Sequence, residues 1–175
     1  MQKNIITSFF SSRVYSEFRK SSLLEDARKS TSEIKGLTSS YLHVVESNEE
    51  LSSKDQVNLN QILAYGEDIK EALVPENTIF IGPRIGTISP WSSRASDIAQ
   101  HCGVDILRIE RIKAISFITN SGKPLSQIEK KSLGQLFYDR MTESIFLDQN
   151  DISKLFIHHT PKPLNYININ DNGIS

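Results

Sequence analysis

The chain has 175 residues, of which 38% are hydrophobic and 23% are charged, and 20 basic side chains nearly balance 21 acidic ones. This composition predicts one folded domain or two small ones and excludes a disordered chain. The near-neutral charge argues against a nucleic-acid partner, and no apolar run approaches the roughly 18 to 20 residues of a membrane span. The only cysteine, Cys102, excludes an internal disulfide, and without a signal-peptide core at the start we expect a cytoplasmic protein.

The first half of the chain is predicted to alternate between strands and helices. The spacing of Phe18, Leu23 and Leu24 predicts that these side chains face the core from the first helix. The predicted elements are a strand at Ile5–Phe10, a helix at Tyr15–Lys29, a strand around Tyr41–Val45, and a helix from Ser52 or Ser53 to about Gly66.

The second half repeats this order. Ser126 and Glu129 form the pattern of a capping box, which predicts the start of the last clear helix. The predicted elements are a strand at Thr78–Ile81, a helix at about Ser92–His101, a long strand or a hairpin at Ile106–Thr119, and a helix from Ser126 carrying Leu133, Leu136 and Phe137 on one face.

An offset of 74 residues aligns the two halves. It places Ser52 on Ser126 and Leu59 on Leu133, so caps and apolar stripes agree at one spacing. The sequence therefore predicts an internal duplication with halves at about 1–74 and 75–148, which share a core that either half alone would build poorly. From about residue 149 the character changes, and we interpret 149–175, which contains Pro161-Lys162-Pro163, as the start of a linker.

The loop between the third predicted strand and its helix carries the strongest functional signal. Residues 81–125 hold six basic and three acidic side chains, and free N–H groups at a helix start bind anions. Alternatively, Ser89, Ser92 or Ser93 caps the helix internally. Trp91 is either a core anchor or an interface residue. The candidate interface or anion-binding residues are Arg84, Gly86, Thr87, Ser89, Trp91, Ser92, Ser93, Arg94 and Asp97.

Two histidine features are interpreted as structural. Cys102 follows His101, but adjacent helical side chains point about 100° apart, so a nucleophile–base pair is not expected. His158-His159 lacks the further ligands that a metal site needs. We therefore assign no catalytic, cofactor-binding or metal-binding residue.

The string from Gly86 to Ala99, GTISPWSSRASDIA, resembles the N-terminal region of the large single-chain phosphoribosylformylglycinamidine synthases. Three positions depart from the family's usual pattern: Ile85 stands where Pro is usual, Arg94 where Lys is usual, and Ile112 where Gly is usual. The resemblance continues through Ser16–Arg19, Leu63–Gly66, Cys102-Gly103, Arg108–Arg111, Tyr138–Glu143, Leu155-Phe156 and Pro161–Leu164.

The resemblance implies a domain similar to a dimer of the small purine-pathway subunit. With the 74-residue repeat it predicts an α+β fold of tandem βαβαβ-like halves, a pseudo-dimer of antiparallel sheets with helices packed on one face. It implies that the domain docks between the synthetase and glutaminase domains of its enzyme, which makes formylglycinamidine ribonucleotide from formylglycinamide ribonucleotide, ATP and glutamine. ATP and Mg²⁺ are implied for the complete enzyme, and no cofactor for residues 1–175. Asp139, Arg140 and Glu143 are candidate contacts to the other domains.

Two other functions stay open from the sequence. The chain is alternatively a free-standing accessory subunit acting in trans, or an independent anion-binding module that uses the loop from Arg84 to Asp97. An exit linker favours a domain over a separate subunit, and the lack of a paired acid/base or nucleophile set argues against an independent enzyme. On each of these interpretations, the chain alone is expected to be inactive in amidine synthesis.

Overall fold

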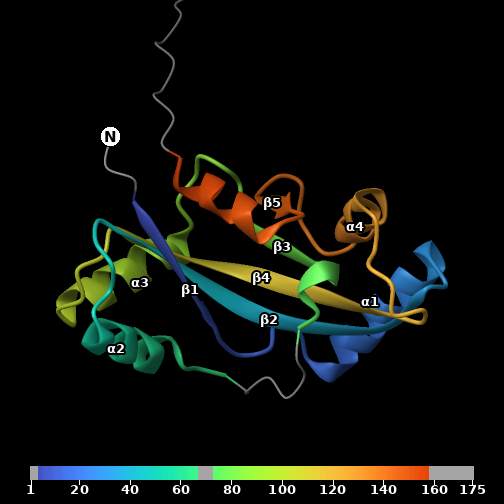
Figure 1. The fold of residues 1–175 in the computed structure, drawn as a ribbon, viewed down its shortest axis with the longest axis horizontal. Helices are drawn as coiled ribbons and strands as arrows, with labels where there is room; N and C mark the ends of the chain where they lie inside the picture. The colour runs from blue at the N-terminus through green and yellow to red at the C-terminus, as the bar shows by residue number, and fades with distance from the viewer. Residues whose placement is uncertain (1–3, 67–72, 158–175) are drawn as a thin grey trace, which may run out of the picture.

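The computed structural model describes residues 4–66 and 73–157 as an α+β fold (Figure 1). Its elements are β1 (Ile5–Phe10), α1 (Glu17–Ser30), β2 (Ile34–Ser47), α2 (Ser53–Leu63), the short 3-10 helix η1 (Pro75–Asn77), β3 (Thr78–Pro83), α3 (Pro90–His101), β4 (Arg108–Thr119), α4 (Gln127–Gly134), β5 (Glu143–Phe146) and the 3-10 helix η2 (Gln149–Phe156).

Each of the four α-helices in the described residues has a serine as its N-cap. Ser16, Ser52, Ser89 and Ser126 each accept a hydrogen bond from the backbone N–H three residues further on. Such a cap satisfies one of the N–H groups that a helix start leaves unpaired. The capping box predicted at Ser126 and Glu129 is confirmed in full.

A single antiparallel sheet forms the centre of the molecule, with strand order β1-β2-β4-β3-β5. The long strands β2 and β4 pair along most of their length, and Ser40 lies opposite Ala114 near the middle. These two residues are 74 positions apart, which is the offset predicted from the sequence. Because β2 and β4 are antiparallel, a local two-fold axis passes between Ser40 and Ala114 and relates each residue of β2 to the residue 74 positions later in β4. The antiparallel pairing agrees with the prediction, and both halves contribute strands to one sheet.

The order of elements repeats at the same offset. Adding 74 to the bounds of α2 gives 127–137, and α4 begins at Gln127. The outer strands differ in register: Ile5 pairs with Ser47, whereas Ile79 pairs with Ile115, six positions earlier than the repeat would place it. The second half also carries β5 beyond β3. The boundaries at 74 and 148 remain predictions.

All four α-helices pack on one face of the sheet, as predicted. At one end, Leu23 of α1 and Leu133 of α4 pack on Phe117 of β4. At the other end, Leu59 of α2 and Ala99 of α3 join one buried cluster with neighbouring strand residues. Figure 1 shows the two pairs at opposite ends of the long strands. The stretch of sheet between the two pairs is left to loops and polar side chains.

The opposite face of the sheet carries η2. Ile152, Leu155 and Phe156 are buried there against Leu42 of β2 and Ile112 of β4. Residues 149–156 are therefore part of the core, although the sequence interpretation assigns them to the start of a linker. Pro161-Lys162-Pro163 lies outside the described residues.

One local expectation from the sequence is wrong, one open alternative is decided, and one strand was not predicted. Phe18, predicted to face the core, is 86% exposed, because the buried stripe of α1 runs through Leu23 and Ala27. Residues 108–119 form one strand and no hairpin. The short strand β5 was not anticipated. Within the described ranges, no helix has both the length and the apolar character that crossing a membrane requires.

Candidate functional site

The loop between β3 and α3 is an exposed, tightly turned segment. Residues 84–88 are all exposed, and both the backbone N–H and the hydroxyl of Thr87 donate to the carbonyl oxygen of Arg84, at 3.0 and 2.6 Å. Gly86 has φ 83°, a left-handed conformation that glycine adopts without a side-chain penalty. The loop thus presents its side chains outward on a fixed turn.

Ser89 ends this loop and caps α3. Its hydroxyl oxygen accepts from the N–H of Ser92 at 3.0 Å, as in the internal-cap interpretation. Both its own N–H and its hydroxyl donate to the carboxylate of Glu110, at 3.1 and 2.8 Å. One serine therefore pairs a free N–H group at the start of α3 and anchors the loop to β4.

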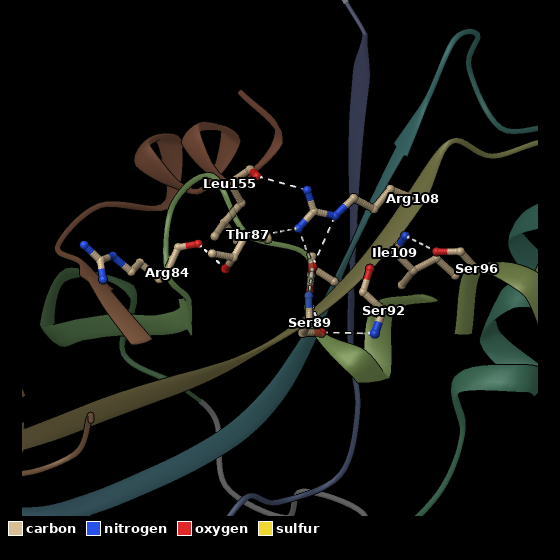
Figure 2. Close-up of polar contacts among 9 residues, drawn as sticks. Arg84, Thr87, Ser89, Ser92, Ser96, Arg108, Ile109 and Leu155 are labelled. Atoms are coloured by element: carbon tan, nitrogen blue, oxygen red, sulfur yellow. Dashed lines mark hydrogen bonds and ion pairs between the residues drawn. The ribbon is translucent and has the colours of Figure 1, made fainter. Parts of the chain in front are cut away.

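A buried ion pair on β4 anchors the loop through hydrogen bonds to Thr87 and Ser89 (Figure 2). Arg108 and Glu110 face each other within one strand, and Glu110 has no exposed surface. The Arg108 guanidinium also donates to the carbonyl oxygens of Thr87, at 2.7 Å, and Leu155, at 3.3 Å. Its carbon lies 5.3 Å from the ring centre of Phe156. This one side chain therefore connects β4, the loop and η2.

The other predicted loop residues divide between the core and the surface. Ser92 is fully buried, and its hydroxyl has no partner among the described residues. Ser93, Arg94 and Asp97 are exposed on α3. The nearby Ser96, which the sequence interpretation did not single out, accepts from the N–H of Ile109 at 2.9 Å and joins α3 to β4. In Figure 2, Ser92 and Ser96 both lie between α3 and β4.

Four rings and one guanidinium form a stack above the central strands. His43 of β2 lies against Trp91, with ring centres 5.3 Å apart, and contacts Tyr65 through a 2.6 Å hydrogen bond. The guanidinium carbon of Arg111 lies 4.9 Å from the Trp91 ring centre and 4.6 Å from that of Tyr41. Trp91 is therefore an internal anchor of the loop as well as a wall of the pocket described below.

Burial sets the protonation state of this stack. Desolvation, aided by the positive charge of Arg111, lowers the pKa of His43 from 6.5 to about 4. Burial likewise raises the pKa of the Tyr65 hydroxyl above its ordinary value. At neutral pH both groups are uncharged, so Arg111 carries the stack's only charge.

The second predicted segment, residues 139–143, forms a turn beside the loop. Asp139 accepts from the N–H of Met141 at 2.8 Å, and Glu143 pairs with Lys113 of β4 at 2.8 Å. The N–H of Arg84 donates to the carbonyl oxygen of Thr142 at 2.9 Å. The structure thus joins two candidate segments that lie some 50 residues apart in the chain.

A pocket of about 640 Å³ lies between the two segments. Arg84, Arg111 and Lys113 line it together with Ile88 and Met141. Ile88 is 58% exposed and Met141 is 76% exposed, so apolar side chains stand at the surface beside a basic interior. Arg140 lies beyond this pocket, where it donates to Gln135 and lines a neighbouring cavity with Arg84.

His101 and Cys102 are not among the residues that line this pocket. Cys102 is exposed at the end of α3, and His101 Nδ1 donates to the carbonyl oxygen of Asp97 at 2.7 Å. His158-His159 lies outside the described residues. Within residues 4–66 and 73–157, no group of three His, Cys, Asp or Glu side chains is placed to hold a metal ion.

The model of one protein family, described as formylglycinamide ribonucleotide amidotransferase N-terminal, matches residues 40–156. The match covers two thirds of the chain and includes both candidate segments. The chain belongs to this family. Its membership of the formylglycinamide ribonucleotide amidotransferase N-terminal family confirms the resemblance drawn from the loop, and it places the chain among domains of a purine-biosynthetic enzyme with several domains.

The sequence analysis named exposed residues of the candidate site and few of its interior. Arg108, Glu110, Arg111 and Tyr65 entered only as part of the family resemblance, and His43 was not singled out. One signal was available: in Arg108-Ile109-Glu110, charged residues alternate with an apolar one in a strand, which places both charges on one face. That this face is buried depends on η2, whose packing the sequence did not predict.

Proposed function

We propose that this amidotransferase N-terminal domain is non-catalytic and docks against the synthetase and glutaminase domains of its enzyme. The docking surface is defined here as loop 84–88 together with turn 139–142. The observation that carries the proposal is that these two segments meet in one exposed surface, joined by the hydrogen bond from Arg84 to Thr142.

Apolar exposure supports a protein partner for this surface. Ile85, Ile88 and Met141 all stand on it, with exposed fractions of 38%, 58% and 76%. Large apolar side chains gathered on an otherwise polar surface mark sites of protein contact. Charged groups surround them, among them Arg84 and Arg140, as at the polar rim of an interface.

Rigidity supports the same interpretation. The buried pair of Arg108 and Glu110 fixes the loop at Thr87 and Ser89 without using any exposed side chain of the loop. A surface that is already fixed before binding loses little entropy when a partner covers it. On this proposal, ATP, Mg²⁺ and glutamine bind to other domains, and the role of residues 1–175 is to hold those domains in place.

The test uses a member of the family from which the equivalent N-terminal domain has been deleted. We expect the chain alone to show no glutamine-dependent amidine synthesis, and to bind the truncated enzyme and restore its activity. Met141→Asp is expected to weaken binding at least about tenfold, because it places a charge in an apolar contact. The matched control is Ile128→Asp, since Ile128 is 82% exposed in the first turn of α4, where an acidic residue is favourable.

Two results would contradict the proposal. One is amidine synthesis by the 175 residues alone. The other is equal loss of binding in the Met141 and Ile128 variants, which would place the contact elsewhere. A folded chain that restores activity only as a separate subunit, in enzymes that lack any domain of this type, would favour the accessory-subunit alternative.

A further inference from the structure

Arg111 is a half-buried cation that no acidic side chain of the described residues pairs with. Its one hydrogen bond in the described structure is to the hydroxyl of Tyr65, at 3.4 Å. Its guanidinium carbon also lies over two rings, 4.6 Å from the ring centre of Tyr41 and 4.9 Å from that of Trp91. A charge that a partner covers is normally paired, so the N–H edge of this guanidinium is available to an anion that the described residues do not supply.

Lys113, on the same face of β4, is by contrast paired with an acidic side chain. It stands two residues further along β4, and it is bound to Glu143 at 2.8 Å and to the carbonyl oxygen of Phe137 at 3.2 Å. Its charge is therefore already balanced within the domain. Arg111 differs because it packs against two rings while its remaining N–H donors have no partner among residues 4–66 and 73–157.

The pocket connects Arg111 with the docking surface. Arg111 and Arg84 line the same cavity of about 640 Å³, and Ile88 and Met141 line it at their exposed positions. With Lys113 and Glu143 balancing each other, the pocket keeps two positive charges. A partner that covers Ile88 and Met141 would enclose these charges and remove them from water.

We propose that an acidic side chain of the docked domain enters this pocket and forms a two-pronged ion pair with Arg111. The inference rests on the proposed docking function and names the chemistry that the partner brings. A carboxylate fits because the planar guanidinium fork matches its two oxygens, and because Arg is the preferred residue for such pairs at interfaces. Arg84, at the same pocket, adds to the attraction.

The experiment measures docking to the truncated family member by calorimetry at several salt concentrations. Arg111→Gln is expected to weaken binding at least about tenfold and to reduce the dependence of Kd on salt. Arg111→Lys keeps the charge but loses the fork and the stack, so it should recover only part of the affinity. The matched control is Arg19→Gln, an exposed cation on α1, which should stay within about twofold of wild type.

Trp91, the only tryptophan, reports on the pocket in the isolated chain. Its fluorescence checks that the Arg111 variants are folded, and a titration with inorganic phosphate tests for a small-anion site. Wild-type affinity in Arg111→Gln would overturn the inference, as would phosphate that saturates the pocket below about 1 mM and competes with docking. If Met141→Asp weakens docking and Arg111→Gln does not, the docking proposal survives and this inference fails. If the wild-type chain does not bind at all, both fail.

Discussion

Glu110 joins β4 to the start of α3 through a fully buried carboxylate. Its carboxylate accepts from Arg108 and from both the N–H and the hydroxyl of Ser89, and it has no exposed surface. A buried charge pair contributes little net stability compared with apolar replacements, but removing one partner leaves the other charge buried and alone.

We therefore expect Glu110→Gln to lower the free energy of unfolding by about 3 kcal/mol, as measured by urea denaturation. Replacing both partners, with Arg108→Met and Glu110→Leu, should recover part of this loss, because no unpaired charge remains. Equal stability of Glu110→Gln and wild type would show that the pair does not hold the loop.

His43 gives the domain a defined response to acid. Its pKa is about 4 in the folded state and near 6.5 when the chain unfolds, so the unfolded state binds the proton more readily. The stability from neutral His43 is thus fully present above pH 6.5 and is lost as the pH falls towards 4. The loss approaches about 1.4 kcal/mol per pH unit within this window.

Denaturation at several pH values checks this expectation. His43→Gln should reduce the decline in the free energy of unfolding between pH 6.5 and 4, because the variant lacks the ring that takes up the proton. The carboxylates that titrate at the lower end of this range remain in both proteins, so part of the decline persists. An NMR titration in which the His43 ring titrates near pH 6.5 in the folded chain would contradict the account.

At the scale of elements, sequence patterns predicted the parts of the fold that are determined locally. The caps at Ser52 and Ser126 and the strand at Ile5–Phe10 follow from nearest neighbours and from periodicity. The exposure of Phe18 and the strand β5 depend on which distant surfaces meet, and so they could not be predicted. The same holds for the site: its exposed loop is visible in the sequence, whereas the pairing of His43 opposite Arg111 is set by the register of β2 on β4.

Ser89 should be the most costly of the helix caps to remove. Ser89→Ala is expected to destabilise the domain by about 2 kcal/mol, since it loses the cap of α3 and a hydrogen bond to buried Glu110 together. Ser16→Ala is the matched control: it removes the cap of α1, whose hydrogen bond is exposed, and should cost about 1 kcal/mol or less. Thermal unfolding of both variants measures the difference, and equal losses would show that the second bond contributes nothing.

At the scale of the whole molecule, duplication explains where the site lies. The four α-helices cover one face of the sheet in two pairs at opposite ends, and this leaves the middle of the face to loops. In the second half, loop 84–88 and the turn before β5 line one pocket together with Arg111 and Lys113 of β4. Because the first half has no counterpart of β5 in the sheet, the docking surface belongs to one half alone.

Hydrogen exchange tests most directly whether loop 84–88 and turn 139–142 contact the synthetase and glutaminase domains, as we propose. The chain is measured alone and in complex with the family member that lacks its N-terminal domain. We expect slower exchange in the complex at residues 84–88 and 139–142, with little change in α1 and β1. Protection centred on α1 or β1, with none in loop 84–88, would contradict it.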